Sequence, residues 1–97
     1  MLKGYDIDGV ITSGVVPDGV IISGRTFAEY DDTCKKLAQT NPLYIRGNGK
    51  FGDREHSGKF KALMIKMLGV NEFYEDDPVQ LDLIQKCCPD CKLVKIN

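Results

Sequence analysis

Residues 2–12 read LKGYDIDGVIT, a short apolar segment that ends in two aspartates and a glycine. Asp6 and Asp8 are two positions apart, and residues with this spacing share one face of a β-strand. Gly9 permits a sharp turn directly after them. Because open α/β folds bind ligands at the carboxyl ends of their strands, this stretch predicts an N-terminal strand that carries two carboxylates to such an edge. Two close carboxylates repel each other, and a hard divalent cation would keep both ionised.

Length and charge limit the kinds of protein this chain could be. Its 97 residues predict one domain over residues 1–97. The 13 basic and 14 acidic side chains leave a formal net charge of -1, so no overall field attracts nucleic acid or a membrane surface. No apolar run is long enough to cross a bilayer, and the N-terminus lacks the pattern of a signal peptide. We therefore expect a cytoplasmic protein without a membrane partner.

Three of the four cysteines lie close together near the C-terminus, and the full set is Cys34, Cys87, Cys88 and Cys91. A tetrahedral zinc site needs a fourth ligand, and the single histidine, His56, is far away in the sequence. We expect reduced, half-buried thiols at a helix end. A disulfide between Cys88 and Cys91 after oxidation in air remains an alternative.

Strand-like and helix-like segments alternate along the rest of the chain. Short runs rich in β-branched and aromatic residues predict further strands at residues 20–23, 43–46, 72–75 and 93–96. Strands separated by helices are typical of a parallel sheet with right-handed crossovers, so we expect a three-layer α/β fold.

Three helices are expected between these strands. The first begins at Thr26, which forms a capping box with Glu29, and ends before Asn41 and Pro42. Its expected apolar face consists of Phe27, Tyr30, Cys34, Leu37 and Ala38.

A polar loop over residues 47–58 precedes the second helix, which ends at Gly69. Its expected apolar stripe consists of Phe60, Leu63, Met64, Met67 and Leu68. The third helix opens with Asp77 as N-cap and Pro78 at the first helical position.

Polar side chains follow four of the predicted strands, at the points where those strands end. Ser23 ends the second strand, Arg46 the third, and the acidic run 75–77 the fourth. In a parallel sheet these positions meet Asp6 and Asp8 at one edge, where chemistry is expected.

Four short motifs, which follow one another along nearly the whole chain, resemble those of the haloacid dehalogenase superfamily. Most members of that superfamily are magnesium-dependent phosphatases. The first motif, D-x-D-G-V-x-T, begins at Asp6, and the second is Ser23-Gly24-Arg25. Lys61 matches the third, and the acidic pair before Pro78 matches the fourth. The resemblance implies a Rossmann-like, five-stranded parallel sheet of order 5-4-1-2-3.

The resemblance also implies roles for individual residues in phosphomonoester hydrolysis. Asp6 would attack phosphorus and form an aspartyl-phosphate, and Asp8 would act as general acid and base. Ser23, Gly24 and Lys61 would bind the phosphoryl oxygens. Mg²⁺ would be held by Asp6, the backbone carbonyl of Asp8, and Asp76.

Several of these assignments have competitors. Lys59 and Lys61 are two apart on a helix and point to nearly opposite sides, so one of them serves, and the family spacing favours Lys61. Asp77 is a natural N-cap, which favours capping over metal binding.

Glu75 stands where the family pattern has Asp, and its longer side chain would reach water or Lys61 instead of the ion. Arg25 could bind substrate or lie in solvent.

The segments where larger family members insert a cap domain, residues 9–19 and 47–58, are too short to hold one. The resemblance therefore implies a capless enzyme with an open site and a phosphorylated substrate, small or macromolecular, with nucleic acid only as a substrate. An alternative is a catalytically degenerate domain that binds metal or a phosphorylated partner without turnover. A response-regulator receiver does not fit, because the third strand ends in Arg46-Gly47 where an acidic phosphoacceptor would be needed.

Overall fold

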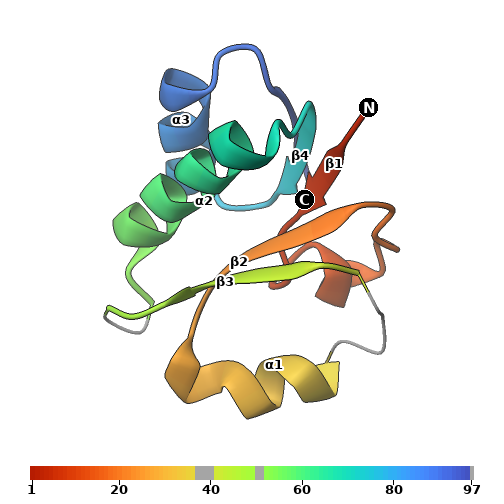
Figure 1. The fold of residues 1–97 in the computed structure, drawn as a ribbon, viewed down its shortest axis with the longest axis vertical. Coiled ribbons are helices and arrows are strands. Elements are labelled where there is room, and N and C mark those ends of the chain that lie inside the picture. Colours follow the sequence, from red (N-terminus) through yellow and green to blue (C-terminus); the bar gives the residue numbers. More distant parts are fainter. Residues whose placement is uncertain (37–40, 50–51, 97) are drawn as a thin grey trace.

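The computed structural model describes residues 1–36, 41–49 and 52–96. These residues form a five-stranded sheet in which all neighbouring strands are parallel, in the order β3-β2-β1-β4-β5 (Figure 1). The strands are β1 Lys3–Tyr5, β2 Val20–Thr26, β3 Leu43–Gly47, β4 Glu72–Glu75 and β5 Lys92–Lys95. Both the parallel arrangement and the predicted strand order are therefore confirmed.

Helices cover the two faces of this sheet in three layers. The longer helices α2 (Arg54–Leu68) and α3 (Pro78–Cys87) lie side by side against one face, and α1 (Tyr30–Lys36) lies on the other (Figure 1). Two short 3-10 helices, η1 (Ile11–Ser13) and η2 (Phe27–Glu29), follow β1 and β2. None of the described helices has the length and apolar character needed to cross a membrane.

The central strand β1 sets the position of the functional edge. Gly4 is paired with Val20 of β2 on one side and with Phe73 of β4 on the other. A side chain at Gly4 would begin only 2.8 Å from Cδ1 of Phe73, so the glycine allows that ring to pack across β1. Because the strands are parallel and in this register, the carboxyl ends of β1, β2 and β4 lie together.

The main core lies between the sheet and helices α2 and α3. Its buried members are Val20, Ile22, Ala62, Ile65, Val70, Phe73, Ile84, Cys88 and Cys91. Cys87, Cys88 and Cys91 are free thiols, as predicted, but Cys88 and Cys91 are buried and Cys87 is exposed, where half-burial was expected. The side chain of Cys34 lies outside the described residues. Burial raises the pKa of the Cys91 thiol to about 11, which is the behaviour of a core residue and not of a metal ligand.

The prediction for the first helix was wrong at its start. Thr26 is the last residue of β2, and a 3-10 turn precedes α1, so Phe27 is 70% exposed instead of buried. The predicted contact between Thr26 and Glu29 is nevertheless present, because Oε1 of Glu29 accepts hydrogen bonds from both the backbone N–H and the hydroxyl of Thr26, at 3.0 and 3.2 Å. The predicted positions 37 and 38 lie outside the described residues.

The second helix is longer than predicted and buries a different face. It begins at Arg54, inside the segment predicted as a loop, because the Asp53 carboxylate caps it by accepting the N–H of His56 at 3.0 Å. Leu63 and Met67 of the predicted apolar stripe are 55% and 69% exposed. The buried face carries Ser57, Gly58, Lys61, Ala62 and Ile65. Phe60, Met64 and Leu68 are partly buried and pack against the core.

Helix α3 begins as predicted. Asp77 is its N-cap and accepts the N–H of Val79 at 3.0 Å, and Pro78 occupies the first helical position.

A pair of phenylalanine variants tests this core. Phe73 is fully buried, so Phe73→Ala should lower the free energy of unfolding by about 3–5 kcal/mol through lost burial and a cavity. The matched Phe27→Ala removes an exposed ring and should change it by less than about 0.5 kcal/mol. Urea unfolding followed by circular dichroism measures both, and equal losses would contradict the observed exposure of Phe27.

Candidate active site

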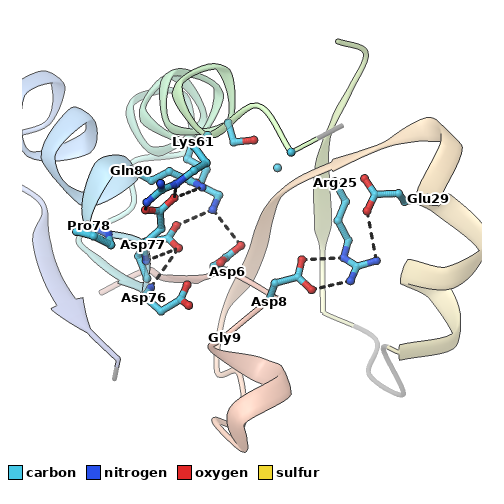
Figure 2. A pocket seen from close by; sticks show the side chains of 15 residues that line it. Asp6, Asp8, Gly9, Arg25, Glu29, Lys61, Asp76, Asp77, Pro78 and Gln80 are labelled. Carbon is cyan, nitrogen blue, oxygen red and sulfur yellow. Dashed lines mark hydrogen bonds and ion pairs between the residues drawn. The ribbon is translucent and has the colours of Figure 1, made fainter. Parts of the chain in front are cut away.

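A cavity of about 510 Å³ opens at the carboxyl edge of the sheet, between the ends of β1, β2 and β4 and the start of α2 (Figure 2). Its acidic lining residues are Asp6, Asp8, Glu29, Glu75, Asp76 and Asp77. Its basic lining residues are Arg25, Arg54 and Lys61. Because the acidic side chains outnumber the basic ones, the cavity is suited to a cation. It can bind an anion only where the acidic side chains are neutralised.

Lys61 joins three elements at the bottom of this cavity. Its Nζ lies 3.0 Å from Oδ1 of Asp6 and 2.6 Å from Oε2 of Glu75, and the side chain is 1% exposed. Burial lowers the pKa of Lys61, but the two carboxylates outweigh burial and hold it above its ordinary value. Helix α2 is thereby fixed to β1 and β4 by a buried, charged contact.

Glu75 is fully engaged by the protein. One carboxylate oxygen accepts from Lys61, and the other accepts the backbone N–H groups of Asp76 and Asp77 at 3.1 and 3.4 Å. Burial raises the pKa of Glu75 well above its ordinary value, against the opposing effect of the Lys61 ammonium. Glu75 therefore holds Lys61, one of the two alternatives that the sequence left open.

Asp6 and Asp76 are the acids best placed for a metal ion. Asp6, Glu75 and Asp76 each offer an oxygen within 4.8 Å of the others. Within the described part of the chain, no hydrogen bond or ion pair engages the Asp76 carboxylate. Gly9, at φ +81°, brings the loop after β1 so close that a Cβ there would lie 1.9 Å from Oδ2 of Asp76. This set of carboxylate oxygens suits Mg²⁺.

Asp8 lies apart from this group. Its carboxylate faces Arg25, with Nε to Oδ2 at 3.0 Å and Nη2 to Oδ1 at 2.6 Å, and not Asp6 (Figure 2). The guanidinium of Arg25 is buried, donates a further bond to Asp32 at 2.8 Å, and has a pKa raised mainly by its hydrogen bonds to Asp8. Asp8 is 60% exposed on its side chain. Arg25 is thus a pocket residue paired with the candidate acid, not a solvated one.

A bulge in β2 explains how Arg25 reaches Asp8. Ser23 pairs with Ile45 and Thr26 with Gly47, so Gly24 and Arg25 together oppose a single residue of β3. Such a bulge redirects side chains and is common next to active sites.

The predicted phosphate-binding residues divide into two groups. Gly24 and Lys61 line the cavity, whereas Ser23 does not: it is 1% exposed, and its hydroxyl oxygen accepts the N–H of Arg25 at 3.1 Å. Lys59 lies outside the cavity and pairs with Glu55 on the solvent side of α2 at 3.0 Å. Lys61 is therefore the lysine that the fold places in the site.

Several lining residues were missed from the sequence, among them Arg54, Ser57 and Gln80. Arg54 and Ser57 lie in the segment predicted as a loop, where the N-cap Asp53 was the signal that a helix begins. With that start recognised, the spacing of four between Ser57 and Lys61 places both on one helical face.

Asp77 is occupied by structural contacts. Besides capping α3, its carboxylate pairs with both Nε and Nη2 of Arg54 and accepts from Nε2 of Gln80 at 2.9 Å. The bonds from Arg54, more than those from Gln80 and Val79, lower the pKa of Asp77 to about 2. The geometry supports the capping role over metal binding.

No protein-family model, curated protein or solved structure matches this chain. The likeness to the haloacid dehalogenase superfamily therefore remains a prediction that depends on the motifs quoted above.

Removing the buried ammonium should be costly. Lys61→Met leaves Asp6 and Glu75 buried without their cation, which should lower the free energy of unfolding by about 3–5 kcal/mol. Lys59→Met, at an exposed pair, should cost less than about 0.5 kcal/mol. The double variant Lys61→Met/Glu75→Gln should lose less than the sum of its single variants, as measured by urea unfolding. Strict additivity would show that the two groups do not interact.

The Asp77–Arg54 pair predicts a pH-dependent contribution to stability. Asn is also a good N-cap, so Asp77→Asn removes chiefly the charge. The pKa of Asp77 falls from 3.8 to about 2 on folding. The ion pair's contribution to the free energy of unfolding is therefore complete at pH values above 3.8 and is lost as the pH falls toward 2. The difference in unfolding free energy between native chain and variant should be constant from pH 7 to 5 and narrow below pH 4. A constant difference at every pH would contradict the ion pair.

Proposed function

We propose that this chain is a Mg²⁺-dependent phosphohydrolase that cleaves phosphomonoesters through an aspartyl-phosphate on Asp6. The observation that carries the proposal is the convergence of Asp6 from β1, Lys61 from α2 and Asp76 after β4 on one cavity. A carboxylate nucleophile, a fixed cation and a further acid for a metal are the groups that attack on a phosphate dianion requires.

The chain's residues fit the implied ion. Asp6 and Asp76 would hold it through carboxylate oxygens, with the backbone carbonyl of Asp8 as the third protein ligand that the resemblance implies. When bound, Mg²⁺ would offset the negative charge of the phosphoryl group and of the attacking carboxylate.

Asp6 is held for attack. Its backbone N–H donates to the carbonyl of Tyr74 at 3.0 Å, and Lys61 fixes one carboxylate oxygen, Oδ1. A carboxylate oxygen of Asp6 would form a bond to phosphorus while the ester P–O bond breaks and the alcohol leaves. Water would then attack the phosphorus of the aspartyl-phosphate, releasing inorganic phosphate and restoring the Asp6 carboxylate.

Asp8 would donate the proton that the leaving oxygen needs and then accept one from the attacking water. To do so, its carboxyl group must leave Arg25 and turn toward Asp6. Its position on the loop after β1 and its 60% exposure allow that rotation.

The site is open to large substrates. Between β1 and β2 the described chain contains only the short helix η1, and α2 begins seven residues after β3 ends. The proposed substrate is accordingly any accessible phosphomonoester, on a small molecule or on a macromolecule, including a nucleic acid end, and the proposed place of action is the cytoplasm.

Magnesium-dependent hydrolysis of para-nitrophenyl phosphate tests the proposal. The native chain should release nitrophenol with Mg²⁺ and lose that activity with a chelator, and Asp6→Asn should reduce it to background. Asp82→Asn is the matched control, because Asp82 is an exposed acid on α3 that pairs with Lys86 away from the cavity. Activity that survives in Asp6→Asn would overturn the proposed nucleophile.

The pairing of Asp8 with Arg25 favours a second candidate, a degenerate domain that binds metal or a phosphorylated partner without turnover. The two differ in their need for Asp8. Asp8→Asn should abolish hydrolysis and leave Mg²⁺ binding by calorimetry unchanged if the chain is an enzyme. A native chain that binds Mg²⁺ but hydrolyses nothing would support the binding domain.

A further inference from the structure

We propose that Ser57, and not Ser23, supplies the hydroxyl that binds the phosphoryl group, beside Gly24 and one helical turn before Lys61. The inference rests on the proposed function, because it assigns a ligand contact within that same site. The resemblance assigned the hydroxyl that contacts the phosphoryl oxygens to Ser23, at the end of the predicted second strand, and the inference assigns it to Ser57 instead.

Ser57 is a buried donor at the cavity with no protein partner. It lies near the start of α2, is 6% exposed and lines the cavity. Its backbone N–H is used by the helix, donating to the carbonyl of Asp53 at 2.9 Å. In the part of the chain that the structure describes, its hydroxyl makes no hydrogen bond. Because this hydroxyl lines the cavity and is engaged by no acceptor of the protein, it can donate to a ligand there without breaking a contact within the protein.

Ser23 serves the backbone instead. Its hydroxyl oxygen accepts the N–H of Arg25 across the β2 bulge, and the residue lies beneath the cavity without lining it. This contact supports the bulge that directs Arg25 toward Asp8. Ser23 is therefore a positioning residue for the strand end.

Gly24 and Ser57 both line the cavity and pack directly against each other. A Cβ added to Gly24 would lie 2.3 Å from Oγ of Ser57 and 2.6 Å from its Cβ, so Gly24 cannot carry a side chain without displacing Ser57. The Gly24 peptide is held from behind, because Nε of Arg46 donates to its carbonyl oxygen at 3.0 Å. The Ser57 hydroxyl thus lies beside a stretch of backbone that Arg46 holds in place.

The basic side chains of the cavity are all paired with acidic side chains. Arg25 is paired bidentately with Asp8, and Arg54 with both oxygens of Asp77. Lys61 contacts Asp6 and Glu75. A tetrahedral oxyanion that enters this site needs a hydrogen-bond donor that is not already paired with an acid, and the neutral hydroxyl of Ser57 is such a donor. Lys61 lies on the same helical face and would contact a second oxygen of the phosphoryl group.

Matched serine variants and inorganic phosphate test the assignment. Ser57→Ala should raise the KM for para-nitrophenyl phosphate and the inhibition constant of inorganic phosphate about 10- to 100-fold, as expected for a lost hydrogen bond to a charged group. Ser23→Ala should change both by less than about threefold and should instead lower stability in urea. Mg²⁺ affinity measured by calorimetry should be unchanged in Ser57→Ala.

Gly24→Ala provides an independent route, since it displaces the Ser57 hydroxyl without removing it. It should weaken the binding of inorganic phosphate as Ser57→Ala does. The double variant Gly24→Ala/Ser57→Ala should bind phosphate little more weakly than either single variant. A loss of phosphate affinity in Ser23→Ala, with Ser57→Ala unaffected, would overturn the assignment.

The assignment and the proposed catalysis can fail separately. Calorimetric titration of inorganic phosphate into the Mg²⁺-loaded chain reports binding without turnover. Phosphate binding that depends on Ser57 in a chain without hydrolytic activity would support this site and overturn the catalysis. A native chain that binds no phosphate in this titration would overturn the site itself.

Discussion

The structure depends on one buried ammonium group. Lys61 is placed where a helix normally presents an apolar residue to a sheet, and it is tolerated there because Asp6 and Glu75 meet it at 3.0 and 2.6 Å. The same contact fixes α2 against β1 and β4 and holds the proposed nucleophile. Stability and the proposed function would therefore use one set of atoms, and the sheet edge cannot be rearranged without exposing or unpairing a buried charge.

The pairing of charges around the cavity determines what can bind there. Each of its cations faces acids: Lys61 faces Asp6 and Glu75, Arg25 faces Asp8, and Arg54 faces Asp77. Asp76 stands outside these pairs, so a divalent cation bound beside it would add the positive charge that an anionic substrate requires. Neutral donors gain importance in such a site, because the guanidinium groups already have partners.

The sequence predicted the sheet more fully than the site. β-Branched runs and the Asp77-Pro78 helix start are local signals, and they gave the strands and α3 close to their observed bounds. The start of α2 was missed because its first turns face a polar cavity, so their composition resembles a loop. The buried face of α2 was misassigned for a related reason: burial of Lys61 depends on carboxylates from distant strands, which hydrophobic periodicity cannot reveal. Ser23 matched a motif by position, but the β2 bulge decides where its hydroxyl lies.

The open edge of the sheet shields the two proposed reacting groups unequally. Asp6 has a side chain that is 8% exposed and is protected by Lys61 and the strand ends, whereas the Asp8 side chain is 60% exposed. Water can therefore reach the Asp8 carboxylate, which pairs with Arg25. A substrate that extends over the loop after β1 would both exclude water and favour release of Asp8 from Arg25. For the proposed phosphohydrolase, a phosphorylated group on a large molecule would gain this shielding, whereas a small phosphomonoester would leave Asp8 open to water.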